Sequence, residues 1–316
     1  MSHLSDLLQA LPVRDSERVA SFRREATHRC IQYPFGSGQA EEFALLAGLR
    51  PLIRQRLRSA ELQATRALAE RYRLRVAIAP RLFTAGSEGR DEEVEQEAVS
   101  GDDVFRTVLI GRDPAQVTRA VDCEADRDDR ELGRLLGYPR CCVEAFVAAP
   151  FPRRNVDLLV ASANRTTARF APRLNIVDFA VFHHISWTPC SFGCGLSLRY
   201  ADAVAALLDR RHPGFRVQID DALGAHRLVL AEDVQVSVRG VWHGSGLRVE
   251  HAWPTAFDRH PAAVLGDDER EAIGRVLALI RGSRELSVDG NALRVDAERW
   301  ALPGAPLLLP FGACAS

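Results

Sequence analysis

Seven cysteines are spread over 316 residues, and four of them fall into two tight pairs. The first pair is the adjacent Cys141 and Cys142, and the second is Cys190 and Cys194, which are separated by three residues. A chain of this length buries a sufficient core without disulfide bonds, and an odd number of cysteines cannot all pair. We therefore predict that the two pairs converge on one site, which ties two distant segments of the chain together.

The residues around each pair indicate the start of a helix. Gly137 is expected to end one helix and Pro139 favours the first turn of the next, so the first pair lies at a helix N-terminus. The second pair is followed by apolar residues at helical spacing, namely Leu196, Tyr200, Val204 and Leu207. A helix N-terminus stabilises negative charge and lowers the pKa of a thiol. Four thiolates brought together in this way need a cation between them.

Two kinds of centre suit four cysteines in a reducing compartment, a zinc ion or an iron–sulfur cluster. Structural zinc favours Cys-x2–4-Cys pairs, in which a tight turn presents both sulfurs. Adjacent side chains on a helix diverge by ~100°, and the different irons of a cubane can accept such divergent sulfurs. The spacing favours a [4Fe–4S] cluster ligated by Cys141, Cys142, Cys190 and Cys194, with zinc as the alternative. Metal-free thiol redox chemistry and plain packing of the thiols stay open.

The two pairs lie in elements that resemble those of an uncharacterised prokaryotic family. Its first element is Gly-Tyr-Pro-x-Cys-Cys-x-x-x-Phe, matched by Gly137 to Phe146, and its second is similar to His184 to Cys194. The resemblance covers roughly residues 105–211 and implies a shared cysteine site without an established reaction. A further resemblance, to the CCG-type cysteine domain of heterodisulfide reductases, implies iron–sulfur binding. Here Val143 replaces the glycine of that motif, and the later pair is Cys-x3-Cys.

Other side chains near the pairs are candidates for supporting the site. His183 and His184 precede the second pair and could supply a ligand or a proton donor, although a histidine is more often hydrogen-bonded structure. Tyr138 and Arg140 flank the first pair, and Arg140 could bind an anionic substrate or neutralise negative charge. Glu144 is the nearest acid, and we predict that it turns away from the sulfurs toward solvent or an arginine.

Three cysteines lie outside both pairs. Cys30 and Cys314 are expected to stay away from the site, while Cys123 is a candidate for an additional ligand. Backbone N–H groups near Cys141 and Cys190 are expected to point toward the shared site, because charge-assisted hydrogen bonds stabilise thiolates.

The composition excludes several kinds of chemistry and partner. All 41 basic residues are arginines, so Schiff-base chemistry, a pyridoxal-phosphate lysine and a Walker A loop are excluded. A net charge of −1 gives no general attraction to nucleic acid or anionic lipid. No stretch reaches the ~18 apolar residues of a membrane span, and the N-terminus lacks the apolar core of a signal peptide. We expect a cytoplasmic protein that binds neither nucleic acid nor membrane, with a small-molecule substrate or redox partner still to be identified.

Hydrophobic patterning predicts an α+β fold, with a mostly helical, cysteine-bearing core containing short strands and then a β-rich C-terminal region. We divide the chain into residues 1–103, 104–212 and 213–316. Helices are expected over most of 1–73, including 15–29 and 56–73, over 114–211 with breaks at prolines, and over 267–281. Strands are expected at 74–79, 104–110, 227–230, 234–241, 247–253, 285–288 and 292–295.

These observations predict a cytosolic iron–sulfur protein that carries a [4Fe–4S] cluster. A cluster with four cysteine ligands would transfer electrons, sense or stabilise structure. A cluster with one thiol missing would offer an open iron for Lewis-acid chemistry of the lyase or desulfurase type. Whether the protein is an enzyme is left open. The alternative is a zinc-stapled binding or regulatory module without catalysis.

Overall fold

The structure is a computed structural model, and its described residues form an α+β fold, as the sequence predicts. The described ranges are 3–11, 39–85, 91–94, 104–150, 155–167, 169–177, 183–211, 213–231, 234–254, 267–304 and 306–311. The predicted helix over 15–29 lies outside the described residues, as do Cys30 and Cys314.

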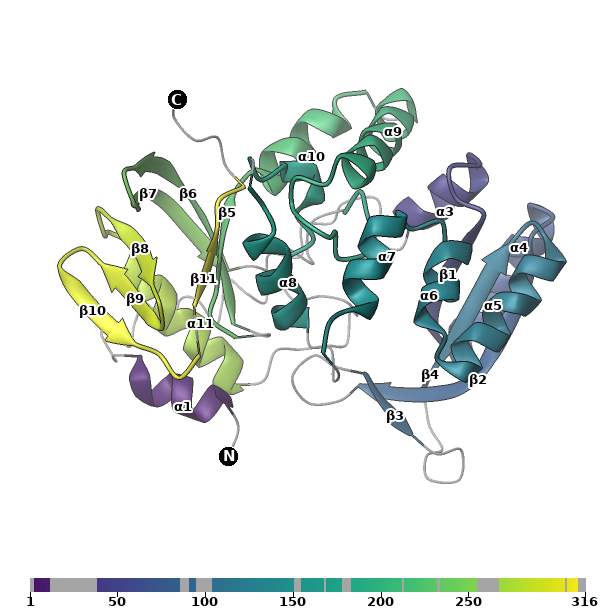
Figure 1. The fold of residues 1–316 in the computed structure, drawn as a ribbon, viewed down its shortest axis with the longest axis horizontal. Helices are drawn as coiled ribbons and strands as arrows, with labels where there is room; N and C mark the ends of the chain where they lie inside the picture. The colour runs from purple at the N-terminus through teal and green to yellow at the C-terminus, as the bar shows by residue number, and fades with distance from the viewer. Residues whose placement is uncertain are drawn as a thin grey trace.

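A four-stranded antiparallel sheet lies toward the right of Figure 1. Its order is β1-β4-β2-β3, with β1 (Leu52–Arg58), β2 (Arg75–Ala85), β3 (Asp91–Val94) and β4 (Val104–Gly111). Nearly every side chain of β4 is buried, since β4 lies between two neighbours and under helices. The associated helices are α3 (Gln39–Leu46), α4 (Ser59–Arg71), α5 (Pro114–Asp126) and α6 (Asp129–Leu135). Side chains of α5 and α6 pack on Leu52, Ala79 and Leu109 of this sheet.

Local sequence signals set the path from α5 to the first cysteine pair. Asp113 caps α5 by accepting a bond from the backbone of Ala115, and Asp128 caps α6. At Gly133 of α6, an added Cβ would lie 2.8 Å from a methyl group of Val143. The absent side chain therefore lets α7 (Arg140–Val147) approach α6 closely.

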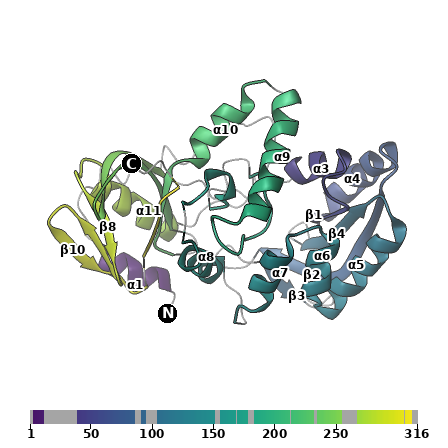
Figure 2. The ribbon, with the colours of Figure 1, turned by 45° about the horizontal axis from the view of Figure 1, so that its top comes forward.

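A group of helices lies between the first sheet and the C-terminal sheet, as Figures 1 and 2 show. Its members are α7, α8 (Asn155–Asn164), the 3₁₀ turn η2 (Pro172–Leu174), α9 (Gly195–Arg211) and α10 (Phe215–Leu223). Their core contains buried Leu159, Leu174 and Phe192 together with Phe311 from near the C-terminus. Cys142 and Cys194 belong to the same cluster, so the cysteine pairs lie at the edge of a packed core.

A seven-stranded antiparallel sheet forms the C-terminal region, in the order β10-β9-β8-β7-β6-β5-β11. Its strands are β5 (His226–Val229), β6 (Gln235–His243), β7 (Gly246–Pro254), β8 (Leu286–Asp289), β9 (Ala292–Val295), β10 (Glu298–Ala301) and β11 (Leu307–Leu309). The helix α11 (Asp267–Ile280) packs on this sheet through Ile273 and Val276. The predicted strands and the predicted helix of this region are confirmed.

Two features of the fold differ from the sequence-based expectations. Residues 52–58, expected within a helical segment, form β1, because all seven residues pair with β4 and tertiary pairing overrides local helix preference. The strands β3, β10 and β11 and the helix α10 were not expected.

Two contacts cross the predicted division of the chain. The N-terminal helix α1 (His3–Ala10) packs on α11 of the C-terminal region through Leu7. The strands β1 to β3, from residues 1–103, pair into one sheet with β4, from residues 104–212. The division at residues 103 and 212 stays a prediction.

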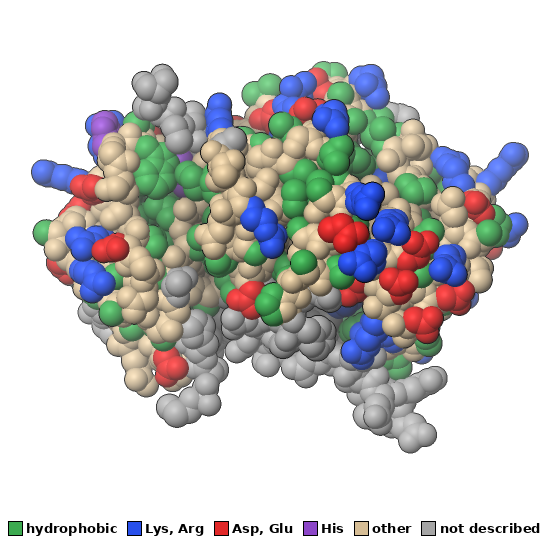
Figure 3. All heavy atoms as spheres, in the orientation of Figure 1, with side chains coloured by type: hydrophobic (Ala, Val, Ile, Leu, Met, Phe, Trp, Pro, Cys, Tyr) green, Lys and Arg blue, Asp and Glu red, His purple; other side chains and the backbone are tan. Residues whose placement is uncertain are grey.

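The surface seen in the orientation of Figure 1 carries charges of both signs. Basic and acidic side chains are interleaved over α5 to α7, on the right of Figure 3. On α6 and α7, the carboxylate of Glu144 pairs with both Arg130 and Arg134. None of the helices in the described ranges is long and apolar enough to cross a membrane.

Candidate metal centre

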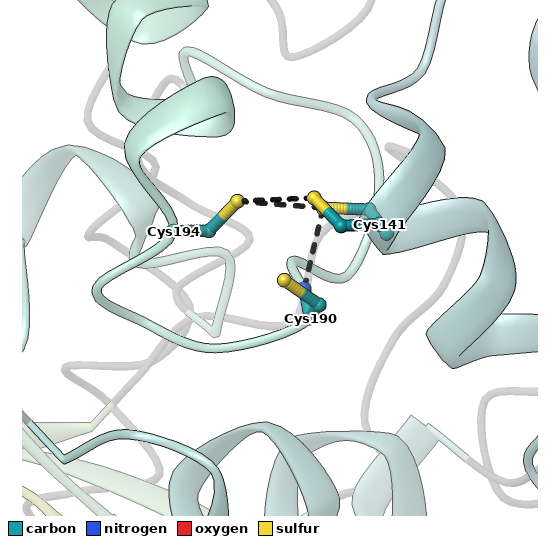
Figure 4. A group of neighbouring side chains, drawn as sticks. Cys141, Cys190 and Cys194 are labelled. Carbon is teal, nitrogen blue, oxygen red and sulfur yellow. Dashed lines mark hydrogen bonds between the residues drawn. The ribbon is translucent and has the colours of Figure 1, made fainter.

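The four paired cysteines converge, as the sequence predicts. Their sulfur atoms all lie within 4.8 Å of one another. The Sγ atom of Cys194 is 3.7 Å from that of Cys141 and 3.8 Å from that of Cys142. Figure 4 shows Cys141 on its helix facing Cys190 and Cys194, which come from the loop that leads into α9. Residues some fifty positions apart therefore form one compact sulfur-lined site.

The first pair is positioned by the first turn of α7. Pro139 is the N-cap, and its carbonyl accepts bonds from the backbone N–H groups of Cys142 and Val143 at 2.8 and 3.0 Å. The preceding Gly137 has φ +75°, a conformation that favours glycine and turns the chain out of α6. Although the two cysteines are adjacent, their Sγ atoms are only 4.0 Å apart. Adjacency therefore does not prevent both sulfurs from facing one centre.

The second pair is held by a tight turn anchored in the core. Phe192, between the two cysteines, is fully buried and its ring lies 4.9 Å from that of Phe311. The hydroxyl of Thr166 accepts a bond from the backbone of Phe192, and the hydroxyl of Ser162 donates to the carbonyl of Pro189. Because these anchors come from α8, from the residues just after it and from near the C-terminus, the turn depends on the folded core.

Two hydrogen bonds reach the sulfur of Cys142. The backbone N–H of Cys190 donates to it at 3.3 Å, and the hydroxyl of Ser197 lies 3.2 Å away. The indole N–H of Trp187 donates to the same hydroxyl oxygen at 3.1 Å. Because an indole nitrogen can only donate, the hydroxyl hydrogen of Ser197 stays available for the sulfur. Such donors stabilise a thiolate.

Burial and neighbouring groups shift the pKa values of three of these thiols. Burial raises the pKa of Cys142 well above its usual range, and it raises the pKa of Cys190 to about 12. Burial acts in the same direction on Cys194, but hydrogen bonds from Ser197 and the neighbouring thiols outweigh it and lower its pKa to about 7. Without a cation, Cys142 and Cys190 are therefore protonated at neutral pH, and metal binding must displace their protons.

The donor set suits a soft metal centre. The group contains four sulfur donors and no carboxylate. Thiolate ligands select zinc and iron–sulfur clusters, whereas calcium and magnesium prefer oxygen donors. The donor atoms are thus of the kind that both centres suggested by the sequence use, and the group can hold a metal ion.

Glu144 turns away from the sulfurs, as the sequence predicts. Its carboxylate pairs with Arg130 at 3.0 Å and with Arg134 at 3.8 Å, which lowers the pKa of Glu144. Arg140 is the exposed first residue of α7, and its charge contributes to the same effect. A bidentate hydrogen bond from Arg130 therefore keeps the nearest acid out of the site.

The two candidate histidines occupy different surroundings. His184 is buried, and burial lowers its pKa to about 4, with Asp220 and Arg173 as its strongest charged neighbours. Its ring is therefore uncharged at neutral pH and faces the ion pair that links Arg173 to α10. His183 is half-buried. The group of four possible metal ligands contains neither histidine, and their roles stay predictions.

Tyr138 belongs to a buried cation–aromatic cluster that the sequence does not reveal. Its ring lies 4.9 Å from that of Trp187, and the guanidinium of Arg50 lies 4.9 Å from the ring of Tyr138. Arg50 is buried, forms an ion pair with Glu41 and donates to the hydroxyl of Ser186 at 2.9 Å. Arg50 thereby joins α3 to the loop that carries Trp187. No local motif marks it, because its partners are distant in the sequence.

Two expectations about the surroundings are only partly matched. The backbone N–H of Cys190 points to the site as expected, but that of Phe192 bonds to a threonine and that of Val143 to a carbonyl of its own helix. Cys123 is buried against the first sheet and is not a member of the four-cysteine group. The backbone N–H groups of Cys142, Val143 and Phe192, which we expected to point toward the sulfurs, bond instead to Pro139 or Thr166.

Part of this region is similar to a known family. Residues 110–201 match a family described as a protein of unknown function (DUF483). The matched span begins in β4, contains all four paired cysteines and ends within α9. No curated protein and no solved structure matched the chain. The match is consistent with the expected resemblance to an uncharacterised family with paired cysteines, and it brings no activity with it. The resemblance to CCG-type domains stays a prediction.

Proposed function

We propose that this protein is a zinc-binding protein in which Cys141, Cys142, Cys190 and Cys194 hold a single zinc ion. The observation that carries the proposal is the spacing of the sulfurs, 3.7, 3.8 and 4.0 Å for three of the pairs. A tetrahedral ion with Zn–S bonds of about 2.3 Å requires sulfurs about 3.8 Å apart. The spacing therefore suits one small ion.

The competing candidate is the [4Fe–4S] cluster that the sequence favours. In a cubane each cysteine binds a different iron, so the sulfurs lie roughly 6 Å apart. All four sulfurs of this site lie within 4.8 Å of one another, so they would have to move outward to hold a cluster. Zinc is the centre that fits without such a movement.

Four thiolates fill the coordination shell of a zinc ion, which is typical of structural rather than hydrolytic zinc. The ion would join the first turn of α7, which packs on α6, to the turn before α9. We therefore propose a binding or regulatory module stabilised by zinc, in a reducing compartment such as the cytoplasm.

Elemental analysis of protein purified without oxygen tests this proposal. We expect a colourless protein with about one zinc per chain, and tetrahedral thiolate spectra after replacement of zinc by cobalt. A brown protein with about four irons and acid-labile sulfide would instead establish the cluster.

Matched cysteine variants assign the ligands. Cys142→Ser should lose the bound zinc, because a buried thiolate ligand is removed. Cys123→Ser is the control, since Cys123 is equally buried but lies outside the sulfur group. Equal zinc content in the two variants would contradict the assignment.

A further inference from the structure

The four sulfurs of the site differ in exposure and in hydrogen bonding. Cys142 is buried and is approached by two donors, and Cys194 is buried beside Ser197. Cys190 is half-buried, whereas Cys141 is exposed. Within the described residues, the hydrogen-bond partners of the Cys141 sulfur are only other cysteine sulfurs.

These differences determine which thiolate can react. A hydrogen bond to a thiolate draws on the same electron pairs that attack an electrophile, so it weakens the nucleophile. Burial in addition keeps reagents away, and reactive cysteines are therefore partly exposed ones. Filled coordination leaves the metal no position for a substrate, but a ligand sulfur keeps lone pairs that can attack. Cys141 alone combines exposure with the absence of oxygen and nitrogen donors in the described part of the chain.

The charged side chains near Cys141 in the sequence are either paired with each other or positive. The nearest acid in sequence, Glu144, is held by Arg130 and Arg134. The preceding Arg140 is exposed and positively charged, and Cys141 lies in the first turn of α7, where the helix dipole favours negative charge. The nearest acid in sequence is therefore neutralised by arginines, and the residue that precedes Cys141 carries a positive charge.

We propose that Cys141 is a modification site, at which the metal-bound thiolate accepts an alkyl group from a small, soft electrophile. This inference rests on the proposed zinc site. In the reaction, a lone pair of the Cys141 sulfur forms a new sulfur–carbon bond. The bond between that carbon and its leaving group breaks, and its electron pair departs with the leaving group as an anion. The product is a thioether, which is a weaker zinc ligand than a thiolate.

The test uses the zinc-loaded full-length protein and methyl iodide as the probe. Peptide mass spectrometry after increasing reaction times measures methylation of each cysteine. We expect Cys141 to be methylated at least about tenfold faster than Cys142, Cys190 or Cys194, because it is the exposed thiolate. Faster methylation of Cys190, or equal rates at all four ligands, would overturn the inference.

Zinc analysis of the same sample separates the two proposals. A sample that contains no zinc before the reaction contradicts the proposed function itself. A sample that contains zinc but is methylated elsewhere contradicts only the role of Cys141. Cys141→Ser should reduce the fast phase of methylation to the rate of the remaining thiols, while Cys123→Ser should leave the fast phase unchanged. The methylation rate of each cysteine is measured in the wild-type protein, so the main result does not depend on whether either variant folds.

Discussion

The two cysteine-bearing segments reach the same site by different means. The segment 137–147 is positioned locally, by the turn at Gly137, the carbonyl of Pro139 and close packing against α6. The segment 187–194 has little regular structure before α9. It is held by contacts of Phe192 with Phe311 and by hydrogen bonds to Ser162 of α8 and to Thr166 just after it. One half of the site is therefore built by its own sequence, and the other half needs the folded core. Changes in the core should affect the second pair more than the first.

The substitution Phe192→Ala should have the largest effect. Phe192 is fully buried and lies between the cysteines of the second pair, so its removal should cost about 4 kcal/mol of unfolding free energy. Denaturant unfolding measures this loss, and zinc titration should show weaker binding because the turn is released. Phe146→Ala, in the segment that is positioned locally, is the control and should cost less, because Phe146 is only half-buried. Equal losses in the two variants would remove the distinction between the segments.

Removal of zinc should loosen the second segment more than the first. At free zinc about a hundredfold above its dissociation constant, binding contributes about 2.7 kcal/mol, which chelation should abolish. Thermal unfolding with and without a chelator measures the effect. Hydrogen exchange should increase mainly over residues 187–194, because α7 keeps its backbone hydrogen bonds. Equal increases over α7 would show that the first segment also depends on the metal.

Zinc affinity should fall as the pH is lowered, with a contribution from each segment. Burial raises the pKa of Cys142 and of Cys190, so both are protonated in the metal-free protein near neutral pH. Each must lose its proton to bind zinc, so affinity should fall at least about a hundredfold per pH unit below neutrality. Competition with a chromophoric chelator between pH 6 and 8 measures the slope. A slope that corresponds to a single proton would mean that only one segment binds as described.

The substitution Ser197→Ala tests the connection between the segments. It removes the hydroxyl that faces the sulfur of Cys142 and leaves the indole N–H of Trp187 without its acceptor. A hydrogen bond to a charged group contributes about 1.5–3 kcal/mol, so zinc affinity should fall by roughly tenfold or more. Isothermal titration measures this change, and Ser59→Ala, at an exposed position of α4, serves as the control. Unchanged affinity would show that the hydroxyl does not support the thiolate.

The substitution Gly137→Ala should have the smallest effect. A residue with a side chain at φ +75° costs about 1–2 kcal/mol, and the new Cβ would lie 3.0 Å from the ring of Pro51. Denaturant unfolding should show this loss, while zinc stoichiometry should stay the same because the carbonyl of Pro139 still starts α7. Gly244→Ala is a control with a similar φ in an open hairpin turn. Loss of zinc would mean that the turn at Gly137 itself holds the first pair in place.

Much of the fold follows from periodicity in the sequence. The strands β5 to β9 and the helix α11 lie where the pattern predicts them. The strand β1 was not predicted, because its pattern of arginines and leucines fits a helix as well as a strand. Its state is decided by pairing with β4, which lies far away in the sequence. Periodicity in the sequence therefore predicts a helix or a strand correctly only where the tertiary contacts favour the same conformation as the local sequence.

The sequence by itself predicted that four cysteines in two pairs form one site, because two helix starts that bear thiols suggested thiolates around a shared cation. Only the tertiary structure decided how closely the sulfurs approach, which donors reach Cys142, and that Arg50 supports the loop beside them. Those features depend on contacts between segments far apart along the chain. Spacing in a sequence fixes only which residues are neighbours on one element, whereas distances between elements arise from packing.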